Sequence, residues 1–191
     1  MKKPRKILVC AQAPPPLHGQ SVMVQHLLHS LEATPRWEVI HLNLQLSHDT
    51  NEIGRFGIAK LLRLFRFRRE LARIIRKENP EILYYVPAPP RPSAILRDFI
   101  LLQGPATRVP RRILHWHAYG MGSRFASVFH PIRHLLRWRY RKSEFWILDR
   151  SLQHEVAPFT PASLSIVPNG IPDPFPDVDV VSQRKARRHD R

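Results

Sequence analysis

The sequence contains a single cysteine, Cys10, among its 191 residues, so an internal disulfide is impossible. This scarcity excludes the class of small secreted proteins that disulfides hold together, and it fits a reducing cytoplasm. Cys10 lies in the apolar run Ile7–Cys10, which predicts a buried structural thiol.

Long apolar runs are also missing. No stretch approaches the roughly 20 apolar residues that a membrane-spanning helix needs. Residues 1–6 are basic like the start of a signal peptide, but the apolar segment behind them ends at Gln12, too early for a signal core. We therefore expect a soluble or peripheral protein.

Acidic residues are scarce: 15 Asp and Glu stand against 31 Lys and Arg, a formal net charge of +16. Such a charge attracts polyanions of any kind, including nucleic acid, anionic lipid and nucleotide phosphates. However, neither the GxGxxG fingerprint of dinucleotide-binding proteins nor the GxxxxGK[ST] loop of nucleoside triphosphatases occurs. The 43% of hydrophobic residues suffice for a core, and the length suits one domain.

Short apolar segments alternate with longer segments of helical period. The predicted strands are 6–11, 37–42, 81–86, 112–116, 144–148 and 164–167, and the predicted helices are 21–31, 58–77, 93–102, 131–142 and 150–157. This alternation predicts an α/β fold, a Rossmann-like parallel sheet with helices on both faces.

The loop after the first predicted strand, residues 14–21, combines three prolines with Gly19, Gln20 and Ser21. Gly19 lets backbone approach a ligand, and Ser21 is a good N-cap for the helix that follows. At the carboxyl end of a parallel strand these features suit ligand binding. An ordinary proline-rich turn explains them equally well.

Two histidines, His115 and His117, end the predicted strand 112–116. Strand alternation places both on one face, with Trp116 on the other. The pair could ligate a metal, but neither a cysteine partner nor an HExxH pattern accompanies it, so we predict no metal site. A histidine here could instead orient a polar substrate, or it could be a core residue that backbone groups satisfy.

These segments, in this order, resemble the N-terminal domain of family 4 glycosyltransferases. The resemblance rests on the PPP-x-x-GQS loop that ends at Ser21, the HxH-A-x-G strand end that begins at His115, and the VPNGI turn of residues 167–171. Such enzymes have the GT-B architecture, in which two Rossmann-like domains face each other across a cleft. The resemblance covers about residues 6–175.

The resemblance implies roles for particular residues. Gly19, Gln20 and Ser21 would line the cleft, His117 would act at the reaction centre, and His115 would be its less favoured partner. The turn Pro168, Asn169, Gly170, Ile171 would be the hinge between the two domains. The implied reaction is metal-independent, retaining sugar transfer, with no cofactor besides a nucleotide-sugar co-substrate.

In that family a second domain holds the nucleotide sugar through a Gly-containing loop and an E-x7-E pair. We therefore expect an acceptor-side domain at 1–172 and a linker with a basic tail at 173–191, without the donor domain. Glu70 and Glu78 have the E-x7-E spacing, but they lie on a basic predicted helix, where local ion pairing explains them. The chain alone should be incomplete as an enzyme, and a separate chain with the donor domain is an expected partner.

Most of the positive charge lies on the predicted helices 58–77 and 131–142. Such arginines can bind an anionic membrane, and Trp138 suits the interface. We predict membrane docking through Arg63, Arg66, Arg69, Arg73, Arg133, Arg137, Trp138 and Arg141. A helical wheel of residues 131–142 places Ile132, Leu135 and Leu136 on the opposite side, against the sheet.

The expected function is transfer of sugar to a lipid-linked or polysaccharide acceptor at the cytoplasmic membrane face. A non-catalytic remnant or subunit that binds a membrane or a partner remains the alternative. A nucleic-acid-binding module is less favoured, because no helix-turn-helix, zinc, RNP or KH signature is present.

Overall fold

A computed structural model describes residues 3–45, 58–87 and 91–170. The predicted tail 173–191 and the last hinge residue, Ile171, lie outside the described residues. Between these limits the chain forms strands and helices in near-strict alternation, as the sequence pattern predicts.

Six parallel strands form one sheet in the order β2-β1-β3-β4-β5-β6. The strands are β1 (Arg5–Ala11), β2 (Trp37–Asn43), β3 (Ile82–Tyr85), β4 (Arg111–Trp116), β5 (Glu144–Ile147) and β6 (Ser163–Ile166). The strand order reverses direction once, between β1 and β3, as in doubly wound sheets. The predicted Rossmann-like α/β class is therefore confirmed.

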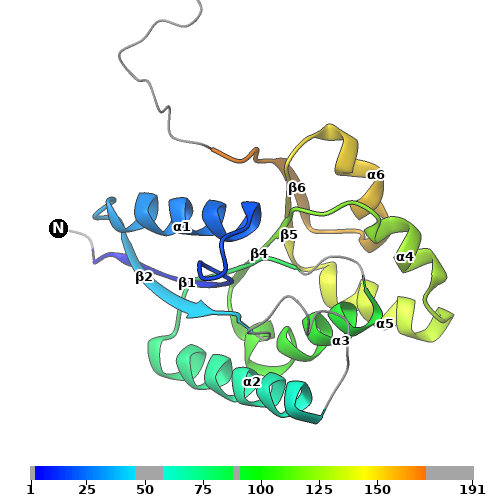
Figure 1. Ribbon diagram of the computed structural model, residues 1–191, viewed down its shortest axis with the longest axis horizontal. Helices are drawn as coiled ribbons and strands as arrows, with labels where there is room; N and C mark the ends of the chain where they lie inside the picture. The colour runs from blue at the N-terminus through cyan, green and yellow to red at the C-terminus, as the bar shows by residue number, and fades with distance from the viewer. Residues whose placement is uncertain (1–2, 46–57, 88–90, 171–191) are drawn as a thin grey trace, which may run out of the picture.

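Helices cover both faces, but unequally (Figure 1). The helices are α1 (Gly19–Glu32), α2 (Ile58–Glu78), α3 (Pro92–Leu101), α4 (Met121–Ser127), α5 (His130–Tyr140) and α6 (Gln153–Val156), with 3₁₀ turns η2 (Gly104–Arg108), η3 (Arg150–Leu152) and η4 (Ala157–Phe159). In the described residues α1 alone packs on one face, through Val24 and Leu28. The apolar residues of α2 to α6 pack on the other. Right-handed crossovers require this division. Only the connection from β1 to β2, which contains α1, runs towards the β2 edge of the sheet, and the later connections all run towards the β6 edge.

The larger core contains Cys10, which is completely buried, as the sequence predicts. Burial raises the pKa of the Cys10 thiol to about 12. Close to it, Asp98 is buried and accepts hydrogen bonds from the Tyr85 hydroxyl at 2.6 Å and the Arg97 Nε at 2.8 Å. The sequence pattern did not single out Asp98, whose hydrogen bond with Tyr85 ties α3 to the end of β3.

The start of α1 differs from the prediction. Its N-cap is His18, not Ser21: the Nδ1 of His18 accepts the backbone N–H of Ser21 at 3.2 Å, and the Ser21 hydroxyl accepts that of His18 at 3.0 Å. Ser21 is therefore the third helical residue of a capping box. Its hydroxyl also donates to the Pro16 carbonyl at 2.8 Å, so it is fully used in holding the loop.

The helix α4 was not predicted. Its first turn is held by Glu155 of α6, whose carboxylate accepts the backbone N–H of Gly122 at 2.6 Å. Although burial acts to raise the pKa of Glu155, hydrogen bonds from the amides of Gly122 and Gly120 lower it overall. A carboxylate at a helix N-terminus satisfies unpaired amides there and is favoured by the helix dipole.

Candidate functional site

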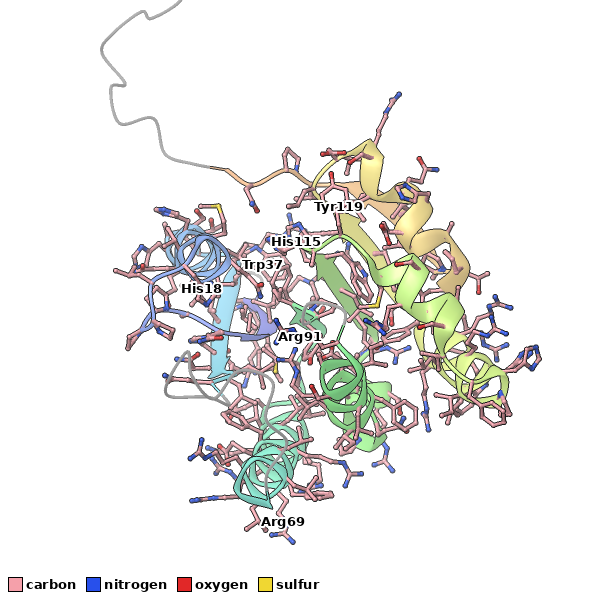
Figure 2. The ribbon with its side chains drawn as sticks, turned by 45° about the vertical axis from the view of Figure 1, so that its right-hand side comes forward. His18, Trp37, Arg69, Arg91, His115 and Tyr119 are labelled. Atoms are coloured by element: carbon pink, nitrogen blue, oxygen red, sulfur yellow. The ribbon has the colours of Figure 1, made fainter. Side chains whose placement is uncertain are left out.

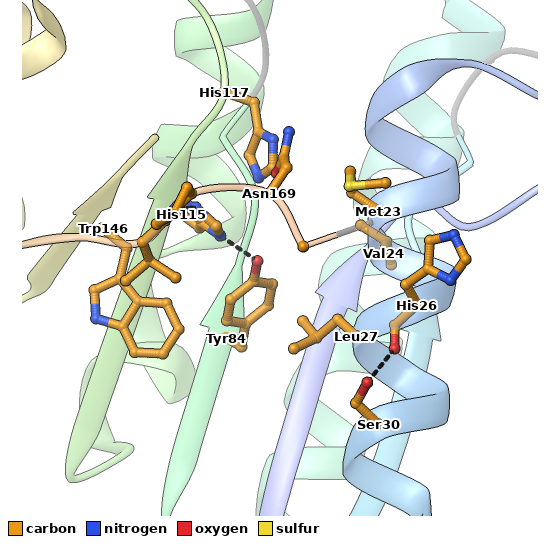
Figure 3. Close-up of a pocket in the computed structure, with 13 residues that line it drawn as sticks. Met23, Val24, His26, Leu27, Ser30, Tyr84, His115, His117, Trp146 and Asn169 are labelled. Carbon is orange, nitrogen blue, oxygen red and sulfur yellow. Dashed lines mark hydrogen bonds between the residues drawn. The ribbon is translucent and has the colours of Figure 1, made fainter. Parts of the chain in front are cut away.

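A pocket of about 190 Å³ lies on the α1 face of the sheet, where β3, β4 and β5 approach their carboxyl ends (Figure 3). One wall is α1, the floor comes from the three strands, and the segment after β6 closes the far side. The lining residues are Met23, Val24, His26, Leu27, Ser30, Tyr84, His115, His117, Trp146, Val167, Pro168, Asn169 and Gly170. This position is the usual one for a ligand in an open α/β sheet.

His115 is held in one orientation by two hydrogen bonds. Its Nδ1 lies 2.6 Å from the Tyr84 hydroxyl, and its Nε2 lies 3.1 Å from the carbonyl of Val167. A carbonyl can only accept, so Nε2 carries the proton and Nδ1 accepts from Tyr84. Burial, followed by the proximity of His117, lowers the pKa of His115 to about 4. The ring is therefore a neutral, fixed part of the pocket floor.

His117 lies beside it, with ring centroids 4.3 Å apart, so the prediction that both histidines share a face is confirmed. Trp116 is on the other face, stacked on Phe159. Burial lowers the pKa of His117 to about 4. Its Nε2 is buried without a hydrogen-bond partner among the described residues. An unsatisfied buried nitrogen is costly, so His117 keeps a hydrogen-bonding capacity that the described residues do not use.

The pocket is mainly apolar, and its few polar groups are uncharged. In the described part of the chain, no Lys, Arg, Asp or Glu lines it. Trp146 meets the Tyr84 and His115 rings edge to face, with centroids 6.1 and 5.8 Å apart. Amide, imidazole and hydroxyl groups beside aromatic faces suit an uncharged, hydroxyl-bearing ligand.

The structure brings together only part of the predicted site. Asn169, with Pro168 and Gly170, lines the pocket beside His115 and His117, although these three residues were predicted only as part of an interdomain hinge. In contrast, Gly19, Gln20 and Ser21 are not among the lining residues, since α1 contributes its middle turns instead. Sequence reasoning also missed Tyr84 and Trp146. Strand alternation would have placed both on the histidine face, had the order of the strands been known.

No protein-family model matches the chain, and comparison with curated proteins finds no significant similarity. The resemblance to family 4 glycosyltransferases therefore stays a prediction from the motifs. What the fold adds is the geometry of the site.

The described residues contain no group of three or more His, Cys, Asp or Glu side chains placed to hold a metal ion. Among the helices in the described ranges, none combines the length and the apolar character needed to cross a bilayer.

The two basic helices, α2 and α5, pack on the face of the sheet opposite α1. On α2, Arg66, Arg69 and Arg73 are exposed and Arg63 is half-buried. Figure 2 shows Arg69 pointing away from the body of the protein. Glu70 binds Arg73 at 2.7 Å and Glu78 binds Lys6 at 2.8 Å, so both carboxylates of the E-x7-E pair serve ion pairs.

The orientation of α5 differs from the wheel prediction. Leu136 and Tyr140 are its buried residues, whereas Ile132 and Leu135 are 49% and 41% exposed. The helix is turned this way because Tyr140 packs in the aromatic cluster around Trp116.

Two of the predicted docking arginines on α5 are bound to nearby backbone. Arg133 donates to the Ala126 carbonyl at 3.2 Å, and Arg137 donates to the Pro158 carbonyl at 2.9 Å. Trp138 and Arg141 are exposed, as predicted. The exposed surface of α5 is consequently a mixture of cationic and large apolar side chains.

Proposed function

We propose that this chain is the acceptor-side domain of a glycosyltransferase of the GT-B type, working with a separate nucleotide-sugar-binding domain. The observation that carries the proposal is the pocket in which His117 and Asn169 meet at the carboxyl edge of the sheet. The motif resemblance assigns His117 to the reaction centre and Asn169 to the hinge between the two domains.

The composition of the pocket supports a sugar acceptor over the donor. A nucleotide diphosphate requires cations or helix N-termini close to its phosphates, and no Lys or Arg lines this pocket in the described residues. Sugar hydroxyls instead match the imidazole and amide groups, and the Trp146 ring offers an apolar face. The pocket likewise contains no pair of carboxylates of the kind that glycoside hydrolysis uses. Donor phosphates would be held by the second domain.

We further propose that α2 and α5 place the domain on an anionic membrane, which would bring it to lipid-linked acceptors at the cytoplasmic face. In support, large apolar side chains are exposed among the arginines: Leu62 at 61%, Phe129 at 72% and Trp138 at 49%. Each basic residue near an anionic surface contributes roughly 1 kcal/mol, and partly buried aromatic rings add to the attraction.

Ligand binding is tested by saturation-transfer NMR with methyl and octyl glycosides of glucose, galactose, mannose and N-acetylglucosamine, and with UDP-glucose and GDP-mannose. We expect a glycoside signal, which His117→Ala removes, and none from the nucleotide sugars. His29→Ala is the matched control, because His29 is exposed in the last turn of α1, outside the pocket. Equal signals from both variants would rule out the pocket as the acceptor site.

Catalysis requires the second domain. If a neighbouring reading frame encodes a Gly-containing loop and an E-x7-E pair, the two chains are coexpressed and supplied with labelled UDP-glucose or GDP-mannose. A transferase is supported if the sugar label appears in the lipid-extractable fraction and if the His117→Ala variant does not transfer it. Glycoside binding without transfer favours the alternative, a non-catalytic subunit.

A further inference from the structure

A second pocket, of about 270 Å³, lies at the opposite edge of the sheet, between the amino end of β4, the turn η2 and the last residues of α5. It is lined by Thr107, Arg112, Trp138, Arg139, Arg141 and Lys142. Arg112 and His115 both belong to β4 but are three residues apart, so they face opposite sides of the sheet and are separated by roughly 10 Å along the strand. The two pockets are therefore distinct.

The lining of this second pocket is strongly cationic. Four of its six residues are Lys or Arg, and no described Asp or Glu lines it. Arg112 is only 7% exposed, yet its side chain forms no hydrogen bond or ion pair with any described residue. Burial, followed by the charge of Arg139, lowers the pKa of Arg112, which is the signature of a cation without a counter-charge. A buried charge without a partner destabilises the fold unless an anion binds it.

The acid on the neighbouring strand β5 is already paired. Glu144 of β5 accepts two hydrogen bonds from Arg111, at 2.6 and 2.8 Å. Arg139 is held by stacking, with its guanidinium carbon 4.3 Å from the centroid of the Trp138 ring. Its Nε is buried and has no hydrogen-bond partner in the described part of the chain. The pocket therefore positions guanidinium groups without neutralising them.

We propose that this pocket binds a phosphate dianion, either inorganic phosphate or the phosphomonoester end of a larger molecule. Arg112 supplies the buried charge, Arg139 a second guanidinium, and Arg141 and Lys142 the exposed rim. Guanidinium forks match the spacing of phosphate oxygens and bind them with charge-assisted hydrogen bonds. This proposal does not rest on glycosyltransferase function, because the histidine pocket contributes no residue to it.

The first test measures thermal unfolding of the full chain in sodium phosphate and in sodium chloride of equal ionic strength. We expect phosphate to raise the midpoint more than chloride does. Arg112→Met should start from a higher midpoint without phosphate, since it removes an uncompensated buried charge, and should bind phosphate at least about tenfold more weakly. Arg76→Met is the matched control: Arg76 is exposed on α2, and its loss changes the net charge equally.

Two further arms identify the source of the phosphate. One titrates soluble glycerol 3-phosphate, and the other measures sedimentation with phosphatidylcholine vesicles that contain or lack phosphatidic acid. If Arg112→Met weakens binding of glycerol 3-phosphate alone, the ligand is a free phosphomonoester. If the substitution also weakens binding to the vesicles that contain phosphatidic acid, the ligand is a lipid headgroup. Identical behaviour of Arg112→Met and Arg76→Met in every arm, or an equal effect of chloride, overturns the proposal. Neither result bears on glycoside binding at His117.

Discussion

Acid should destabilise this fold through the two pocket histidines. Burial lowers the pKa of His115 and of His117 to about 4, from the ordinary histidine value of 6.5. Between these values the unfolded chain binds a proton at each histidine and the native chain does not. The free energy of unfolding is therefore at its full value above pH 6.5, decreases as the pH falls towards 4, and has no further dependence on these groups below that.

The size of the effect follows from the shift. Midway between the two pKa values, each pH unit costs about 1.4 kcal/mol per histidine. The slope is smaller near either pKa, so lowering the pH from 6.5 to about 4.5 removes about 2 kcal/mol for each. Since the two rings lie 4.3 Å apart, protonating one opposes protonation of the other, and the pair titrates as a unit. A loss of this size is a large fraction of the stability of a typical domain.

The assay is urea unfolding followed by circular dichroism across this pH range, on the native sequence and on His117→Gln. We expect the native sequence to lose more stability towards acid than the variant, by about 2–3 kcal/mol at pH 4.5. His29→Gln, which changes an exposed histidine, should keep the native pH dependence. Parallel curves for the native sequence and His117→Gln would refute the buried, neutral state of the pair. Titration of the ring protons by NMR measures the two pKa values directly.

Two more substitutions test the packing. Gly122→Ala should lower the free energy of unfolding by about 1–3 kcal/mol, because the new Cβ would lie 3.1 Å from the Cα of Glu155 and displace α4 from its cap. The control is Gly19→Ala, whose new Cβ meets open space. In the same urea experiment it should change the free energy of unfolding by less than about 1 kcal/mol. Cys10 should resist iodoacetamide in the native state and react only at the rate of unfolding, since it is completely buried and burial raises its pKa to about 12. Mass spectrometry measures the labelling, and rapid labelling of the native state would contradict this prediction.

Much of the fold follows from local patterns. Aliphatic runs such as Ile7–Cys10 form the strands, and alternation correctly sends His115 and His117 to one face and Trp116 to the other. These features are local because the two-residue period of a strand is intrinsic to its backbone. Strand order is not local, and for that reason the sequence pattern could not show that Tyr84 and Trp146 flank the histidines.

Two of the missed features, α4 and the orientation of α5, depend on partners far away in the sequence. The helix α4 contains Gly122 and lacks a clear apolar period, and its cap, Glu155, lies on α6. The N-cap of α1 is a histidine nitrogen, an acceptor that the usual preference for Ser, Thr, Asp and Asn does not include. In α5 a helical wheel allows several buried arcs, and the packing of Tyr140 beside Trp116 selects one of them.

The distribution of charge constrains how the two parts of the proposed function fit together. With a net charge of +16, the chain nevertheless leaves its histidine pocket without Lys or Arg in the described residues, and it carries its basic helices on the opposite face of the sheet. A helix layer alone is about 10 Å thick. If α2 and α5 rest on the membrane, an acceptor sugar must reach around the carboxyl edge of the sheet to approach His117. Under the proposal, this geometry favours an acceptor whose reacting sugar is separated from its lipid by a spacer, such as a growing lipid-linked glycan. A single sugar directly attached to the lipid would remain on the membrane side.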